Sequence, residues 1–302
     1  MSDKKRVIVI AGPTAVGKTS VAIAVAKHLH TEIISADSRQ CFKELNIGVA
    51  RPAPHELSEV KHHFIATHSI HQKVTAATFE QYTLDKCAEI FRERDVVVVT
   101  GGTGLYIKAF YEGMDEIPDV PPIIRQEILG QYEQYGLDWL QAEVQKLDPA
   151  FYDLGEIKNP HRLMRALEVF KATGKSILSF RTGKKAQRAF EIVKIALELP
   201  KEDLHRNIDN RVDKMMQTGL LEEVKSLVPY QHLNALQTVG YKEFFDHLNR
   251  ETILEQAVHL VKRNTKQYAK RQMTWFKKDP AYHWMTPDPT EVIRYIGNLT
   301  LG

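Results

Sequence analysis

The stretch Arg6-Val-Ile-Val-Ile-Ala-Gly12-Pro13-Thr14-Ala15-Val16-Gly17-Lys18-Thr19 decides the fold of this chain. Its first half is a run of β-branched residues bounded by glycine, which is typical of a strand buried on both faces of a parallel sheet. Its second half matches G-x-x-x-x-G-K-[ST] at every required position. A helix is predicted from Lys18 to about His30, with small apolar residues on one face. This order of strand, glycine-rich loop and helix predicts a phosphate-binding loop.

The chemistry of this loop follows from its geometry. Loop N–H groups and the N-terminus of the next helix point at phosphate oxygens, Lys18 adds a positive charge, and the Thr19 hydroxyl can bind Mg²⁺. We therefore expect a di- or triphosphate group to be bound, with Mg²⁺ as cofactor, by Gly12, Pro13, Thr14, Ala15, Val16, Gly17, Lys18 and Thr19. The loop alone does not identify the phosphate compound.

Strands and helices alternate along the first part of the chain. A second strand is predicted at 31–37 and a third at 96–102, the latter preceded by a helix near 79–94. After about Gly113 the pattern turns helical until about Lys175; the segment 190–199 then alternates as an edge or last strand would, and the chain is helical again from Lys201. We expect an α/β fold: a P-loop NTPase-like parallel-sheet core with a helical C-terminal region (residues 1–115 and 188–302), interrupted by a mainly helical insertion domain (116–187).

Composition narrows the class of protein. The chain has 302 residues, 43% of them hydrophobic and 26% charged, and no apolar run approaches the roughly 18 residues that span a bilayer, so we expect a cytoplasmic protein. Only Cys41 and Cys87 are present, which excludes a multi-disulfide framework and a four-cysteine zinc site. A net charge of +3 is too small to indicate a nucleic-acid partner by itself.

The residues after the third strand argue against NTP-hydrolysing motors. Val96–Val99 leads into Thr100-Gly-Gly-Thr-Gly, where such an enzyme would carry an acidic residue for Mg²⁺. Motor ATPases and GTPases are thus disfavoured, whereas a small-molecule kinase remains open. Thr103 in this segment ends a strand at the edge where the phosphates are expected, so its hydroxyl is a candidate donor to them.

Asp37 is a candidate general base. It follows the second strand at the ligand-binding edge of the sheet and opens the polar tetrad Asp37-Ser38-Arg39-Gln40. A carboxylate beside the phosphates could take a proton from a nucleophile or hold Mg²⁺ through water. The alternative is a carboxylate that caps the next helix.

The helix predicted at about 252–278 is rich in basic residues. Lys262, Lys266 and Lys270 fall at i, i+4 and i+8, and no acidic residue lies between Gln256 and Lys278. Such a stripe is often only a solvated face, but the interleaved aromatic residues favour an RNA surface. Arg162 and Arg165 predict a second basic patch on the insertion. Blander roles are expected elsewhere: packing for His62 and His63, and an inert thiol for Cys41.

Six blocks together resemble the tRNA dimethylallyltransferases, also called tRNA isopentenyltransferases, of the bacterial type. They are Gly12–Thr19, Asp37–Gln40, Gly101–Tyr106, Arg162–Glu168, Gln237–Lys242 and Lys270–Trp275. They occur in the family's order and span nearly the whole chain. The resemblance implies transfer of a dimethylallyl group from dimethylallyl diphosphate to N6 of adenosine 37, in tRNAs that read codons beginning with U, giving N6-(dimethylallyl)adenosine and diphosphate.

The same resemblance assigns roles to residues. Lys18, Thr103, Arg211 and Mg²⁺ on Thr19 would stabilise the departing diphosphate, and Asp37 would accept the N6 proton of a base splayed out of the anticodon loop. The tRNA-binding residues would be Asp37, Ser38, Arg39, Gln40, Thr103, Arg125, His161, Arg162, Leu163, Met164, Arg165, Gln237, Thr238, Val239, Gly240, Tyr241, Lys242, Lys270, Arg271 and Gln272.

Some positions depart from the family's pattern. Phe42 stands in place of a usual Tyr, Asn207 at a frequent Arg position, and His161 at a frequent Gln position. These departures concern base recognition rather than the reaction class. A monomer without a C-terminal zinc finger is expected, and nucleotide or ATP binding by the loop is left open. A related prenyltransferase acting on free adenine nucleotides is the nearest alternative, which the helical insertion and basic C-terminal region disfavour.

Overall fold

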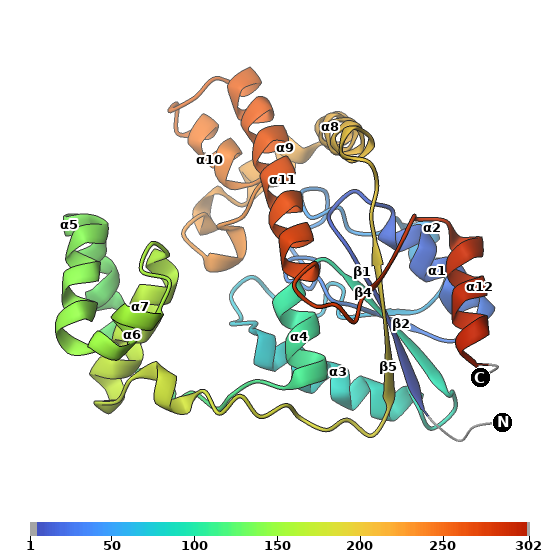
Figure 1. Cartoon of the computed structure of the whole chain (residues 1–302). Coiled ribbons are helices and arrows are strands. Elements are labelled where there is room, and N and C mark those ends of the chain that lie inside the picture. Colours follow the sequence, from blue (N-terminus) through green and yellow to red (C-terminus); the bar gives the residue numbers. More distant parts are fainter. Residues whose placement is uncertain (1–4, 301–302) are drawn as a thin grey trace. The chain divides into compact units, whose positions relative to one another are not determined.

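The computed structural model describes residues 5–300 and divides them into two compact units (Figure 1). The core unit comprises residues 5–112 and 187–300, and the insertion unit comprises Gly113–Ala186. Each has its own hydrophobic core. No helix within residues 5–300 combines the length and the apolar character needed to cross a bilayer.

The core unit is built on one parallel sheet of six strands, counted over the described residues, in the order β3-β2-β4-β1-β5-β6. The strands are β1 (Arg6–Ala11), β2 (Ile33–Ser35), β3 (His62–His63), β4 (Val96–Gly101), β5 (Glu191–Leu197) and β6 (His283–Met285). The order reverses beside β1, and in open α/β sheets the crevice at the carboxyl ends of the strands near such a point is where ligands bind.

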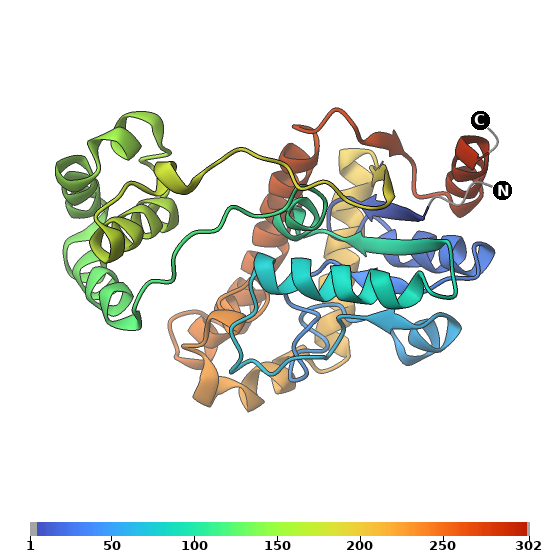
Figure 2. The same ribbon diagram turned by 90° about the horizontal axis from the view of Figure 1, so that it is seen from below.

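Both faces of the sheet are covered, as the continuous apolar β1 requires. Val7 and Val9 of β1 belong to one core cluster, and Ile8 and Ile10 belong to the other. The first cluster is covered mainly by α3 (Ala76–Ile90), α4 (Gly104–Glu112), α9 (Leu220–Ser226), α10 (Lys242–Leu248) and α11 (Leu254–Phe276). The second is covered mainly by α1 (Lys18–His28), α8 (Lys201–Gln217) and α12 (Pro289–Thr300). Figures 1 and 2 show α1 and α12 side by side.

Two strand predictions are corrected by the structure, and one short strand is added. The segment 190–199 does form a strand, but β5 is internal, because β1 and β6 flank it. The region after Lys201 is not helical throughout, since β6 lies between α11 and α12. His62 and His63 form the short strand β3 beside β2. Strands of two and three residues are too short to show a periodic pattern, so no periodicity could predict them. A short helix, α2 (Pro54–Glu59), precedes β3.

The insertion unit is helical, as expected. It contains α5 (Pro122–Leu147), α6 (Pro149–Leu154), α7 (Pro160–Thr173) and the short 3₁₀ helix Ile177–Phe180. Gly136 interrupts α5 with a φ of 76°, which bends the helix at a residue that tolerates this conformation. Ile128, Leu140, Phe151 and Leu163 are buried in its core.

Arg188 holds the chain where it returns to the core unit. Its Nε donates to the Phe110 carbonyl (2.8 Å) at the end of α4, and its guanidinium pairs with Glu80 (2.7 Å). The exit and return points of the insertion are therefore fixed next to each other within the core unit.

Candidate active site

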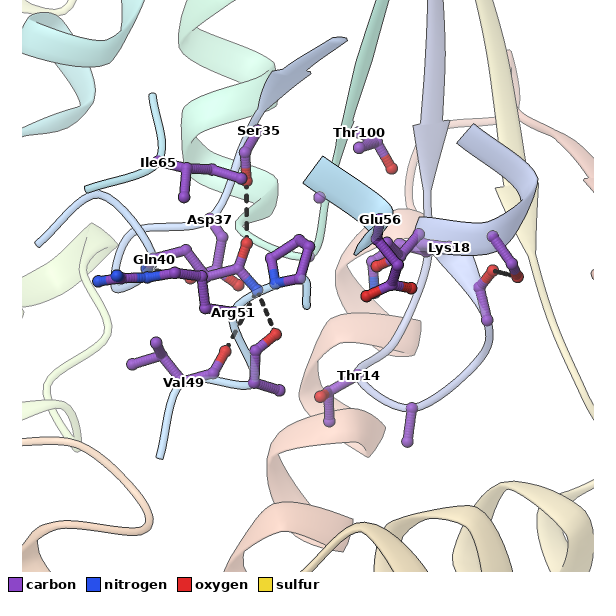
Figure 3. A pocket seen from close by; sticks show the side chains of 18 of the residues that line it. Thr14, Lys18, Ser35, Asp37, Gln40, Val49, Arg51, Glu56, Ile65 and Thr100 are labelled. Carbon is purple, nitrogen blue, oxygen red and sulfur yellow. Dashed lines mark hydrogen bonds between the residues drawn. The ribbon is translucent and has the colours of Figure 1, made fainter. Parts of the chain in front are cut away.

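The loop predicted to bind phosphate, Gly12–Thr19, lies between β1 and α1, which is the position expected for it. Gly12 and Gly17 have φ values of 149° and 101°, which favour glycine, and a Cβ at Gly12 would meet the Leu197 carbonyl at 2.8 Å. Ala15 also has a positive φ, of 65°. This strained turn places the N-terminus of α1 at a cavity of about 330 Å³. Thr14 and Lys18 line it (Figure 3), as does Thr19.

Two cations from distant parts of the chain meet at this loop. Lys18 Nζ donates to the Pro13 carbonyl (2.7 Å), and Arg211 on α8 donates to the Thr14 hydroxyl (3.3 Å). Burial and the neighbouring Arg211 guanidinium lower the pKa of Lys18 to about 7, although Asp37 opposes the shift. A bound anion would favour the charged form of Lys18, which is compatible with the predicted phosphate ligand.

Asp37 lines both this cavity and a second one of about 230 Å³. Its Oδ1 accepts backbone N–H groups from Arg39 (2.8 Å) and Gln40 (3.2 Å), so the carboxylate caps the turn that follows β2 rather than a helix. Both hydrogen bonds use the same oxygen. The cap therefore orients the carboxylate at the wall shared by the two cavities, which is compatible with the predicted role as a base.

The two cavities differ in character. The first presents hydroxyl, carboxylate and cationic side chains, whereas the second adds an apolar wall from α8, α11 and two loops. That wall is formed by Val49, Val212, Met215, Val239 and Val261. The residues that line both cavities are Thr14, Asp37, Val49, Ala50, Arg211 and Tyr268. A charged group and an apolar group could thus lie on either side of Asp37.

The loop after β4 is packed against α11. Thr103 Oγ1 accepts the Ser38 N–H (3.0 Å), which ties the loop after β4 to the turn that contains Asp37. Thr103 is not among the residues of 5–300 that line the two cavities, whereas Gly101 and Gly102 line the first. A Cβ at Gly102 would meet Gln272 at 2.2 Å, and one at Gly104 would meet Trp275 at 2.1 Å. The glycines of this motif therefore permit close approach of α11.

Gln272 joins this loop to the phosphate-binding loop. It is buried, its Oε1 accepts the Thr14 N–H (2.8 Å), and its Nε2 donates to the Gly102 carbonyl (2.9 Å). Both ends of the amide are used inside the protein.

Oxygen donors suited to Mg²⁺ surround the first cavity. Thr19, Asp37 and Glu56 all line it, and hydroxyl and carboxylate oxygens together with phosphate oxygens and water are what this ion prefers. Within residues 5–300, no cluster of three or more His, Cys, Asp or Glu side chains is arranged to hold a metal ion by itself. The residues present therefore fit an ion held jointly with a phosphate ligand.

Comparison with known proteins gives the family. A family model described as IPP transferase matches residues 40–279. A tRNA dimethylallyltransferase of Christiangramia forsetii is 48% identical over 279 residues, covering 92% of each chain. A tRNA dimethylallyltransferase 1 of Bacteroides thetaiotaomicron is 44% identical over 290 residues, covering 96% of this chain and 94% of that one. The chain belongs to the tRNA dimethylallyltransferase family.

Solved structures of the family share the fold. The full-length tRNA isopentenylpyrophosphate transferase of Bacillus halodurans is 32% identical with a TM-score of 0.72, covering 99% of this chain and 96% of that one. A eukaryotic dimethylallyltransferase acting on tRNA is 28% identical with a TM-score of 0.74, covering 90% of this chain and 69% of that one. The α/β fold with a parallel sheet is thus confirmed.

The lysine stripe on α11 differs from its prediction. Acidic partners are present after all, because Lys262 pairs with Asp213 (2.6 Å) and Lys266 with Asp209 (2.8 Å), both on α8. Lys270 is exposed, and Arg271 lies over the Tyr268 ring at 5.7 Å. Only the C-terminal part of the stripe keeps the character expected of an RNA surface.

The other segments predicted to face tRNA contain both exposed and buried side chains. In the insertion unit, Arg162 pairs with Glu156 (2.8 Å), while Arg125 (3.9 Å) and Arg165 (3.3 Å) approach Glu168. His161 is exposed and Met164 half-buried, but Leu163 is fully buried in the helical core.

In the core unit, Thr238, Val239 and Gly240 line the second cavity, whereas the Tyr241 side chain is fully buried. Gln237 donates to the Gln231 carbonyl (2.6 Å), and Lys242 is exposed at the start of α10. Tyr241 therefore packs in the core beneath this segment and does not face the cavity.

Several cavity residues escaped the sequence reasoning. Ser35 and Glu56 line the first cavity, but neither belongs to a motif with a known spacing. Thr100 and Tyr268 line it too, although the sequence predicted them only as part of a strand end and of the aromatic residues on the basic helix. His62 also lines it, while His63 is buried against Glu32, so one histidine packs and its neighbour faces the cavity. Cys41 is packed in the core, as expected. Burial raises the pKa of its thiol to about 12, so the reactive thiolate is disfavoured.

Proposed function

We propose that the chain transfers a dimethylallyl group from dimethylallyl diphosphate to N6 of adenosine 37 in tRNAs that read codons beginning with U. The products are N6-(dimethylallyl)adenosine and diphosphate. The observation that carries the proposal is Asp37, which lies between a cationic phosphate cradle and a cavity with an apolar wall.

Each part of the reaction has a residue suited to it. The adenine N6 attacks the C1 carbon of the dimethylallyl group, the C1–oxygen bond breaks, and its electron pair leaves with the diphosphate. Lys18, Arg211 and the loop N–H groups stabilise that charge, and Asp37 takes the N6 proton. Mg²⁺, held by Thr19 with Asp37 and Glu56 nearby, would neutralise diphosphate charge.

A labelling experiment tests this function. The protein is incubated with radiolabelled dimethylallyl diphosphate and, in separate reactions, unmodified tRNA or AMP, with Mg²⁺ present or removed by EDTA. We expect label in tRNA at position 37 and a large loss with EDTA. Label in AMP alone would instead indicate a nucleotide prenyltransferase.

Two further measurements test the kinase alternative and the expected monomer. Incubation with γ-labelled ATP should give no phosphate transfer to a small acceptor, whereas turnover would indicate a kinase. Light scattering of the protein as it elutes from a size-exclusion column should report the mass of a monomer, 34.6 kDa.

A further inference from the structure

The loop from Phe42 to Arg51 forms a wall of both cavities without regular secondary structure. Val49 and Ala50 line both, and their carbonyls accept hydrogen bonds from Gln40 Nε2 at 3.2 and 3.0 Å (Figure 3). Gln40 in turn donates its backbone N–H to Asp37. The position of this loop therefore controls the surroundings of the proposed base.

A single carboxylate from another helix holds the N–H groups of this loop. Glu223 on α9 accepts from the backbone of Asn46 (3.2 Å), Ile47 (2.7 Å) and Gly48 (3.0 Å). Three converging N–H groups on one ionised carboxylate make a strong, charge-assisted set of hydrogen bonds. Without Glu223 these donors would lose their partner.

Tyr241 and Glu223 together form the anchor of this loop. Its side chain is fully buried, and its hydroxyl donates to Glu223 Oε1 at 2.6 Å. Burial and the adjacent Glu223 carboxylate raise the pKa of Tyr241, so it stays a donor at neutral pH. Gly48 is needed here, because a Cβ would lie 2.6 Å from the Tyr241 ring.

Arg51 secures the carbonyl side of the same loop. Its NH2 group donates to the carbonyls of Phe42 (2.8 Å), Lys43 (3.1 Å) and Leu45. The backbone N–H groups of the loop thus donate to the negative Glu223, and its backbone carbonyls accept from the positive Arg51. Both the donors and the acceptors of the loop backbone are therefore held by charged side chains.

We infer that Glu223, with Tyr241, is a positioning residue that holds the Asn46–Ala50 wall, and through Gln40 the Asp37 turn, in place for the acceptor base. The inference rests on the proposed function for its effect on catalysis. Within residues 5–300, no hydrogen bond or ion pair joins Gly12–Thr19 or Arg211 to Glu223 or Tyr241, so the groups that hold the diphosphate should be independent of Glu223.

The test is Glu223→Gln, in which an amide NH₂ must face at least one of the backbone donors. We expect kcat/KM for tRNA to fall about tenfold while KM for dimethylallyl diphosphate changes by less than about twofold. Tyr241→Phe removes one hydrogen-bond donor but leaves the Glu223 carboxylate bonded to the three backbone N–H groups. It should therefore give a smaller fall in kcat/KM for tRNA. Glu222→Gln, on the same helix with 70% of its side chain exposed, is the matched control.

Hydrogen exchange gives a readout that does not depend on activity. The amides of Asn46, Ile47 and Gly48 should exchange faster in Glu223→Gln, with those of the phosphate-binding loop unchanged. The inference would be overturned if amide exchange at 46–48 were unchanged. It would also be overturned if kcat/KM for tRNA and KM for dimethylallyl diphosphate were impaired by equal factors. If the wild type transfers no label, the proposed function fails and the exchange data alone judge the anchor.

Discussion

One oxygen of Asp37 accepts both N–H groups of its own turn, which separates the structural and chemical duties of this residue. Asp37→Asn keeps an acceptor for those N–H groups but cannot accept the N6 proton. We expect the single-turnover rate to fall about 10²–10⁴-fold, with diphosphate binding retained. Asp37→Ala should additionally lose about 1 kcal/mol of stability, because the two hydrogen bonds within the turn are removed. A near-normal rate for Asp37→Asn would exclude the role as base.

Gln272 allows a second prediction at this scale. Gln272→Met fills the same space but leaves the Thr14 N–H and the Gly102 carbonyl without a partner. We expect the free energy of unfolding to fall by about 1–3 kcal/mol and pyrophosphate binding to weaken, as measured by urea unfolding and calorimetry. A variant with normal stability and weaker tRNA binding would show instead that Gln272 contacts RNA directly.

Between β2 and β3, a buried histidine makes stability depend on pH. Burial lowers the pKa of His63, although Glu32 opposes the shift. Burial acts to raise the pKa of Glu32, but the hydrogen bonds and charges of His63 and Lys61 together outweigh it and leave that pKa lowered. In both cases the unfolded chain binds the proton at a higher pH than the folded protein does, so acidification favours unfolding.

The measurable consequence is a fall in the free energy of unfolding as the pH drops below about 6.5, the pKa of an unfolded histidine. His63→Gln should flatten the profile of urea midpoints between about pH 7 and about pH 5. His71→Gln, at an exposed position, serves as the control. Equal profiles for wild type and His63→Gln would show that the pair does not titrate on unfolding.

The ion pairs between α8 and α11 change which lysines of α11 are expected to contribute to tRNA binding. Lys270→Ala should reduce the slope of log affinity for tRNA against log salt by about 1, since an exposed lysine is free to meet phosphate. Lys262→Ala should leave the slope nearly unchanged, because Asp213 already neutralises that lysine. Filter binding at several salt concentrations measures both. Equal changes would mean that the ion pairs open when RNA binds.

At the scale of the whole molecule, the phosphate cradle lies entirely in the core unit. Replacing 113–186 by a short flexible linker should leave a folded protein, because Arg188 already holds the return point beside Phe110. We expect pyrophosphate affinity to be kept and kcat/KM for tRNA to fall at least about tenfold, since phosphate contacts supply much of RNA affinity. Loss of pyrophosphate binding would show that the core depends on the insertion.

The sequence predicted what local patterns encode. The phosphate-binding loop, its flanking strand and helix, and the helical insertion each have a continuous signature, and the family resemblance supplied the reaction. It did not predict features formed by contacts distant in sequence. The lysines of α11 find their aspartates on α8, and Glu223 reaches a loop about 175 residues earlier. No spacing rule connects such positions.

The internal place of β5 has a consequence for synthesis on the ribosome. β1 pairs with β4 on one side and with β5 on the other, and residues 113–186 are made between those two strands. While they emerge, the Val- and Ile-rich β1 keeps one edge open, and an open apolar edge invites pairing with other chains. An insertion unit that folds as soon as it is made would shorten that exposure, so slow translation of this segment should increase aggregation of the nascent chain.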